Sequence, residues 1–297
     1  MCDVTIAGYH LGCPMWAEPS WRGSFAPRVG PANEALTHYA SVFNTVEGNT
    51  TFYSLPSSES VARWADVTPP DFRFCFKAPR SVTHDARLVE ADDTMDTFLE
   101  RIAPLGERLG PLMVQLPPSF GPDRLGALDA FLDRFARGCE VAVELRHRGF
   151  FDDPAAAEDA DAVLNAHACE RIVMDTRALR AGDPRHPQVV AARHAKPDLP
   201  VRPGPLTDRP LYRWVGHPDA TTNEPWLRDL ASLVAAWMRD GRCPYVMIHC
   251  PDTGRTPWMA RRFHEILATT HPDLDVGELP PFPAERAAAS DAQLSLF

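Results

Sequence analysis

Short apolar segments alternate with longer amphipathic segments from the start of the chain to about residue 270, and this alternation limits the possible folds most strongly. Short continuous apolar runs predict buried strands, whereas apolar positions repeating every three or four residues predict helices. Eight segments are predicted to be strands: Val4–Gly8, Val42–Glu47, Phe72–Lys77, Leu112–Leu116, Val141–Leu145, Arg171–Asp175, Leu211–Val215 and Tyr245–His249. Helices are predicted near Ala32–Ala40, Ser58–Ala65, Thr94–Leu109, Asp123–Phe135, Ala155–Ala168, Pro225–Met238 and Pro257–Thr269.

Strands that alternate with helices indicate an α/β protein with a parallel sheet and crossover helices. Eight repeats in one chain of this length favour a (β/α)8 TIM barrel over an open sheet, and we expect it to occupy residues 1–278. Residues 176–209 are rich in Pro, Arg and His and are predicted to be a long connection without a clear helix. Connections of that length are usually functional or mobile.

The composition limits the classes of function. A net charge of −10 counts against non-specific binding of nucleic acid through a basic surface, although a local basic groove stays possible. The seven cysteines include no C-x-x-C pair, which is typical of free thiols in a reducing compartment. Neither a signal peptide nor an apolar run long enough for a membrane span is recognisable, so we expect a soluble cytoplasmic protein.

Polar side chains stand at the predicted carboxyl ends of the strands, where TIM barrels carry their chemistry. The predicted catalytic residues are Glu47, Asn49, Lys77, His84, Gln115, Glu144, Arg146 and Asp175. The predicted substrate-binding residues are Trp16, Tyr53, Arg213, His249 and Asp252. Lysine occurs only at positions 77 and 196, so a lysine at a strand end is a specific signal. Such an amine could bind an anion, act as a base or form a Schiff base.

Each of these residues also has a purely structural interpretation. Gln115 could hydrogen-bond the following loop, and Asp175 could cap a turn. Glu144 and Arg146 could be an ion pair, and Lys77 could pair with a glutamate, because buried charges must be paired whatever their role. The carboxylates and histidines could bind a divalent metal, although no H-x-H or H-E-x-x-H spacing points to one.

At these positions the chain resembles the YecE-like family, known as domain of unknown function 72. The residues that carry the resemblance are Gly12, Trp16, Tyr39-Ala40, Phe43, Glu47, Asn49, Thr51-Phe52-Tyr53, Phe74, Phe76-Lys77, Thr83-His84, Gln115-Leu116-Pro117-Pro118, Glu144, Arg146-His147 and Asp175. They span the whole predicted barrel. The resemblance implies a TIM barrel in a bacterial, intracellular setting, and it supplies no reaction.

The chain departs from the family pattern in three places. The family's E-I-N-S-T-F-Y is E-G-N-T-T-F-Y at residues 47–53, which keeps the polar positions. The family's Arg-x-His-Gly is R-W-V-G at residues 213–216, so one histidine is missing. The paired asparagines after the eighth strand are replaced by H-C-P-D at residues 249–252. His249 and Asp252 could compensate for these changes, or the site could be altered.

The C-terminal stretch, residues 279–297, is predicted to be a disordered linker that ends in a short binding motif. The last five residues, Q-L-S-L-F, resemble the peptide that binds the bacterial β sliding clamp. In that interpretation Gln293 forms hydrogen bonds, and Leu294, Leu296 and Phe297 fill an apolar groove on the clamp. The alternative is an apolar terminus that folds back onto the barrel.

These features lead to three hypotheses. The first is a clamp-tethered DNA-processing or repair enzyme, a nuclease-like hydrolase in which Glu144 or Glu47 is the base and Lys77 and Arg146 bind phosphate, with assistance from His84 or Asp175. The second is a small-molecule enzyme that acts on a phosphorylated or carboxylated metabolite. The third is a non-catalytic adaptor whose barrel binds a partner.

Overall fold

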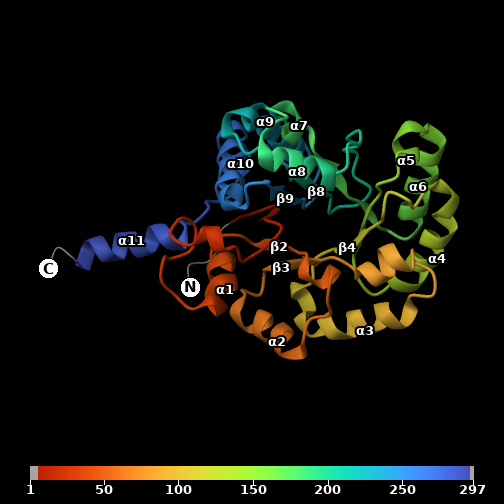
Figure 1. Cartoon of the computed structure of the whole chain (residues 1–297), viewed down its shortest axis with the longest axis horizontal. Coiled ribbons are helices and arrows are strands. Elements are labelled where there is room, and N and C mark those ends of the chain that lie inside the picture. Colours follow the sequence, from red (N-terminus) through yellow and green to blue (C-terminus); the bar gives the residue numbers. More distant parts are fainter. Residues whose placement is uncertain (1–5, 295–297) are drawn as a thin grey trace.

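The computed structural model describes residues 6–294, in which nine short strands alternate with eleven α-helices (Figure 1). The strands are β1 His10–Gly12, β2 Thr45–Gly48, β3 Arg73–Phe76, β4 Leu112–Gln115, β5 Val141–Glu144, β6 Glu170–Arg171, β7 Val173–Asp175, β8 Leu211–Val215 and β9 Tyr245–His249. The helices are α1 Ala35–Ala40, α2 Ser58–Val67, α3 Asp92–Ile102, α4 Leu125–Phe135, α5 Gly149–Asp152, α6 Pro154–Ala166, α7 Arg177–Ala181, α8 Pro187–Ala195, α9 Ala220–Arg239, α10 Thr256–Thr270 and α11 Pro283–Leu294.

All the strand pairs are parallel, as the alternation of strands and helices predicts. The hydrogen-bonded orders are β1-β9-β8-β7, β2-β3 and β4-β5-β6. Single backbone contacts join neighbouring sheets: the Glu47 amide donates to the Cys13 carbonyl at 3.0 Å, and the Ala78 amide donates to the Met113 carbonyl at 3.0 Å. The prediction of an α/β fold with parallel strands is therefore confirmed.

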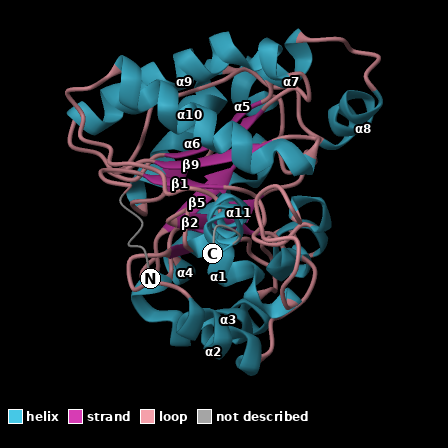
Figure 2. Ribbon diagram, turned by 90° about the vertical axis from the view of Figure 1, so that its left-hand side faces the viewer, coloured by secondary structure: helices cyan, strands magenta, loops and turns pink. Residues whose placement is uncertain are grey.

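The strands lie in the middle of the molecule and the helices lie outside them (Figure 2). The mostly apolar sequence of the strands explains this arrangement, because β8 and β9 are buried at every position and need cover on both faces. Local signals begin the covering helices. The Asp153 carboxylate accepts a hydrogen bond from the Ala155 amide at 3.0 Å before α6, and the Asp219 carboxylate accepts one from the Thr221 amide before α9 at 3.0 Å.

A small cluster of buried side chains lies apart from the main core between strands and helices. Its members come from most of the strands and their junctions: Cys75, Met113, Ala142, Ile172, Leu211, Tyr245 and Met247. These residues are at most 5% exposed, so their side chains form a second buried core on the strands.

Three predictions about the elements are wrong. No strand occupies residues 6–8; β1 begins at His10, because Gly8 adopts a left-handed φ of 75° that interrupts an extended chain. The connection 176–209 contains two helices, α7 and α8. Proline at the first position favours α8, and Val189 buries its side chain against the carboxyl ends of β7 and β8.

The third correction concerns the predicted linker, where helix α11 covers residues 283–294. Phe282, just before it, is fully buried and stacks edge-on against Phe25 at 5.0 Å. The Glu285 carboxylate accepts a hydrogen bond from the Phe282 amide at 2.6 Å and pairs with Arg261 at 2.8 Å. These contacts fix the start of the helix. Of the predicted clamp motif, Leu296 and Phe297 lie outside the described residues.

None of the helices described is long and apolar enough to cross a membrane.

Candidate functional site

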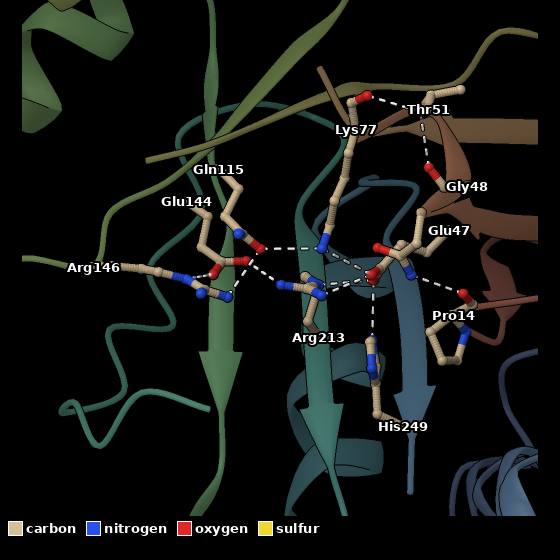
Figure 3. A network of polar contacts seen from close by, with 11 residues as sticks. Pro14, Glu47, Gly48, Thr51, Lys77, Gln115, Glu144, Arg146, Arg213 and His249 are labelled. Atoms are coloured by element: carbon tan, nitrogen blue, oxygen red, sulfur yellow. Dashed lines mark hydrogen bonds and ion pairs between the residues drawn. The ribbon is translucent and has the colours of Figure 1, made fainter. Parts of the chain in front are cut away.

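A pocket of about 590 Å³ lies at the carboxyl ends of the strands, and we call it the mouth pocket. Its lining comes from the ends of β2, β3, β4 and β8, from the loops after β1, β5 and β9, and from α8. Nine predicted site residues line it or lie directly beneath it: Glu47, Asn49, Tyr53, Lys77, Gln115, Glu144, Arg146, Arg213 and His249. Figure 3 shows Glu47, Lys77, Gln115, Glu144, Arg146, Arg213 and His249 converging from the ends of β2, β3, β4 and β5 and from β8 and β9.

Arg213 on β8 joins two carboxylates at the centre of the site. Its Nε and Nη2 atoms donate to the two carboxylate oxygens of Glu47 at 2.7 Å each, and its Nη1 donates to Glu144 (Figure 3). All three side chains are at most 1% exposed. A buried arginine held by two carboxylates is a fixed element of the site, because removing either partner would leave a buried charge unpaired.

The two glutamates are therefore held in the ionised form. Burial alone would raise the pKa of Glu47, but Arg213, His249 and Lys77 together hold it well below its usual value. Burial opposes ionisation of Glu144 as well, and Arg146, Arg213 and Lys77 nevertheless lower its pKa to about 2. Carboxylates this strongly stabilised are weak bases near neutral pH. Their contribution here is to position cations.

Lys77 is the side chain in the site that is best placed to transfer a proton. Its Nζ donates to Gln115 Oε1 at 3.1 Å and lies 3.5 Å from Glu47 Oε1. Burial, followed by the positive charge of Arg213, lowers the pKa of Lys77 to about 7. An amine with this pKa exists in both protonation states at neutral pH, which suits a general acid or base.

Gln115 connects Lys77 to Arg146. The Arg146 Nη2 donates to Gln115 Oε1 at 2.9 Å, and the Arg146 Nε donates to Glu144. One amide oxygen therefore accepts from two cationic side chains, so the Gln115 side chain points into the site and does not bond the following loop. Both the ion pair expected between Glu144 and Arg146 and a role for Arg146 at the mouth are compatible with this geometry.

His249 and Asn49 complete the part of the site nearest β1. The Nε2 of His249 lies 3.0 Å from Glu47 Oε2, and burial lowers the pKa of His249 to about 4. A neutral imidazole satisfies this contact only with its proton on Nε2, which then donates to the carboxylate. Asn49 Nδ2 donates to the Pro14 carbonyl at 2.8 Å, which ties the loop after β1 to the turn after β2.

Lys196, directly after α8, also lines the mouth pocket, and the sequence analysis did not include it in the site. Burial and the charge of Arg213 lower its pKa to about 8. Its amine has no hydrogen bond or ion pair within the part of the chain that the structure describes. The scarcity of lysine was the available signal, but the connection was predicted to lack a helix that could bring Lys196 over the strands.

Four predicted site residues do not line the mouth pocket and make structural contacts instead. Asp175 is held by Arg177 at 2.8 Å and by the Tyr212 hydroxyl at 2.7 Å. Asp252 pairs with Arg255 at 3.2 Å. Trp16 packs edge-on against an indole and a phenyl ring of the core, and His84 packs edge-on against Phe52.

These placements follow from the local chain direction. Asp175 ends β7, and its carboxylate bonds the Arg177 amide at 2.9 Å, so it caps the turn into α7. His84 lies in a single turn of π-helix, Ser81–Asp85, where its Nδ1 is 2.9 Å from the Thr83 hydroxyl. Burial and the charge of Arg146 lower the pKa of His84 to about 4, so its imidazole is neutral at pH 7.

Among the residues that the structure describes, no group of three or more His, Cys, Asp or Glu side chains is arranged to hold a metal ion. At the mouth pocket the two carboxylates already accept hydrogen bonds from guanidinium groups.

Comparison with known proteins identifies the family. The family model described as "Protein of unknown function DUF72" matches residues 10–286. The chain is 35% identical over 276 residues to the UPF0759 protein YecE of Escherichia coli (strain K12), which covers 93% of this chain and 98% of that protein.

Solved structures of the same family share the fold. A DUF72 family protein from Thermotoga maritima aligns with a TM-score of 0.67 at 25% identity over 87% of this chain and 98% of its own. One from Enterococcus faecalis aligns with a TM-score of 0.64 at 22% identity over 88% of this chain and 96% of its own. The chain therefore belongs to the DUF72 family, also represented by YecE.

Proposed function

We propose that the mouth pocket binds an anionic ligand, either a phosphorylated or a carboxylated compound. Lys77 transfers a proton to or from this ligand. The surplus of basic side chains carries this proposal. Two carboxylates, Glu47 and Glu144, face four basic residues: Lys77, Arg146, Lys196 and Arg213. An anion entering the pocket would neutralise charge that the protein itself leaves unbalanced.

The roles follow from the contacts. Arg213 is saturated by its two carboxylates and acts as a positioning residue. Lys77 and Arg146 present their remaining N–H groups to the pocket, and Lys196 approaches from α8. This assignment moves the acid–base role from Glu47 and Glu144, where the sequence analysis placed it, to Lys77, because the pKa of Lys77 is about 7.

Calorimetric titration with inorganic phosphate tests the binding step. We expect Lys77→Met to weaken phosphate binding about tenfold or more, since a charge-assisted hydrogen bond is lost. Arg209→Met, at the opposite ends of the strands, is the matched control and should bind phosphate normally. Equal affinities for the wild type and Lys77→Met would refute the proposal. A panel of phosphate monoesters and diesters, assayed with wild type and Lys77→Met, then tests for hydrolysis.

A second candidate function is that of a clamp-tethered DNA-processing or repair hydrolase. The observation that favours it is the terminal Q-L-S-L-F at the end of α11, which extends away from the rest of the chain (Figure 1). The test is a pull-down with the bacterial β sliding clamp, using the full chain and a variant that lacks residues 293–297. Nicked and forked DNA with added divalent metal ions would then report processing. Clamp binding that survives the deletion removes this candidate.

We further propose that the strands close into one (β/α)8 barrel in the cytoplasm. Support for closure comes from the contacts that join the separate sheets and from the second buried core on the strands. Support for a reducing location comes from the six described cysteines, all of which are free thiols. A crystal structure that left β1 and β2, or β3 and β4, without continuous pairing would disprove closure.

A further inference from the structure

A second pocket of about 490 Å³ adjoins the mouth pocket, and we call it the outer pocket. Phe52 and Tyr53 line both pockets, so these two side chains form a wall between them, which we call the aromatic ridge. The ridge belongs to the turn after β2, in the stretch that carries Glu47 and Asn49. A ligand that filled both pockets would have to pass across it.

The ridge is fixed to the strand end that carries Lys77. The Thr51 hydroxyl donates to the Lys77 carbonyl at 2.8 Å and lies 3.1 Å from the Gly48 carbonyl (Figure 3). Phe52 is 9% exposed, and the Lys77 amine lies 5.9 Å from the centre of its ring. The distance between the ridge and the proposed anion site is therefore set by hydrogen bonds and not by a mobile loop.

Tyr53 has a ring that the fold does not use. It is 80% exposed, whereas each of the other four tyrosines is at most 1% exposed. Its aromatic contact is with Phe52, at 5.1 Å and an interplanar angle of 89°, so it meets the neighbouring ring edge to face. An exposed aromatic ring beside a cationic pocket is suited to stacking on a planar group of a ligand.

The two pockets differ in charge. Hydroxyl groups and carboxylates dominate the polar lining of the outer pocket: Thr51, Ser54, Ser81, Asp85, Asp93, Thr94 and Thr97. Its one arginine, Arg80, is paired with Asp85 at 3.4 Å. The Asp93 carboxylate forms no hydrogen bond or ion pair within residues 6–294, although its charge interacts with that of Arg134. Such a lining repels a phosphate and accepts hydrogen bonds from ligand hydroxyls.

We propose that the two pockets together bind a nucleotide. Its phosphate occupies the mouth pocket, its base stacks on Tyr53, and its ribose hydroxyls face Asp93 and the hydroxyl groups of the outer pocket. This inference rests on the proposed anion site and names the ligand class for it. In a nucleotide the ribose joins the phosphate to the base, so the ribose would lie across the ridge, with its hydroxyls toward the outer pocket and the base on the exposed ring of Tyr53.

Calorimetry on the full chain with inorganic phosphate, ribose 5-phosphate and adenosine 5′-monophosphate tests this. We expect the nucleotide to bind most tightly and Tyr53→Ala to weaken its binding about tenfold, the effect of losing one stacked base. Tyr53→Phe should keep the nucleotide affinity, because its ring can still stack on the base. Val29→Ala, which also truncates an exposed apolar side chain, is the control.

Each contrary outcome has a distinct meaning. Nucleotide affinity that is unchanged in Tyr53→Ala overturns the inference, as does ribose 5-phosphate binding as tightly as the nucleotide, which would indicate a sugar-phosphate site. Normal phosphate binding without any gain for the nucleotide defeats this inference alone. Phosphate that binds the wild type no better than Lys77→Met defeats the proposed function beneath it.

Discussion

Charged side chains are paired differently at the amino ends and at the carboxyl ends of the strands. At the amino ends, carboxylates are matched within the protein: Glu170 accepts hydrogen bonds from the Leu206 and Thr207 amides and from the Thr207 hydroxyl at 2.8 Å, and Glu140 pairs with Arg209. At the carboxyl ends, basic groups outnumber carboxylates, and the Lys196 amine forms no hydrogen bond or ion pair with the described side chains. This difference supports the proposal that the charged cluster at the carboxyl ends, and not the one at the amino ends, binds an anionic ligand.

The largest expected effect is from Arg213→Met. It leaves Glu47 and Glu144 buried and without their shared cation, so we expect the free energy of unfolding to fall by about 3–5 kcal/mol. Urea unfolding followed by circular dichroism measures the change. A loss under about 1 kcal/mol would mean that the two carboxylates protonate or rearrange easily. The interaction of Arg213 with them would then be no stronger than a solvent-exposed ion pair.

Glu170→Gln tests the amino end. The amide keeps one acceptor oxygen but loses the charge that several donors share, so we expect destabilisation of about 1–3 kcal/mol. Phosphate binding should stay at the wild-type level, because the change lies at the other end of the strands. Weaker phosphate binding in Glu170→Gln would contradict the proposal that only the carboxyl ends of the strands bind the anion.

The pH dependence of anion binding should report the two lysines of the mouth pocket. Lys77, with a pKa of about 7, and Lys196, with a pKa of about 8, are both mostly cationic at pH 6 and mostly neutral at pH 9, so anion affinity falls as pH rises. Sulfate is the suitable probe, since its charge is constant over this range. We expect about a tenfold loss, equal to about 1.4 kcal/mol, between pH 6 and 9. Calorimetry at several pH values measures it.

The chain's two lysines make an internal control for that experiment. After reductive methylation with ¹³C-labelled formaldehyde, each lysine gives its own NMR signal, and we expect midpoints near pH 7 and pH 8. Lys196→Met should keep the midpoint near 7. If both signals titrated near pH 10, the lysines would be solvated and the sulfate affinity would not change below pH 9.

The smallest effect is expected from Arg209→Met. The Arg209 and Glu140 side chains are 51% and 46% exposed, so solvent screens their interaction and the stability should change by about 0–1 kcal/mol. Thermal unfolding with and without 1 M NaCl measures it. If Arg209→Met lost as much stability as Arg213→Met, solvent exposure would not explain the difference between the ion pairs at the two ends of the strands.

Most strand positions could be predicted from sequence because their signal is local. The strands Leu211–Val215 and Tyr245–His249 were predicted at their observed bounds, as short and mostly apolar runs. The first strand was misplaced because a short apolar run looks extended whether or not a glycine turns the chain behind it. Helix α8 was missed because its buried contacts, through Val189, come from β7 and β8, which lie far away in sequence.

The part of the site that lies at the ends of the strands could be predicted from the sequence. The carboxyl ends of parallel strands lie at the same edge of the sheet, so Glu47, Lys77, Gln115 and Glu144 come together. Arg213 reaches Glu47 and Glu144 from the middle of β8. The residues in loops were less predictable, because a loop's direction depends on contacts that sequence spacing does not contain. Asp175 shows the limit, since it ends a strand and still turns to its own loop.

Helix α11 has a fixed attachment to the rest of the molecule and a defined length. Its first turn is fastened by Arg261 to Glu285 and by Arg286 to Ser41 at 2.6 Å, and its twelve residues extend about 18 Å at the usual rise of an α-helix. A partner held at its far end would thus sit at a set radius from the body. A rigid helix therefore limits the distance between that partner and the pocket to a narrow range. A flexible tether of equal length would allow every shorter distance as well.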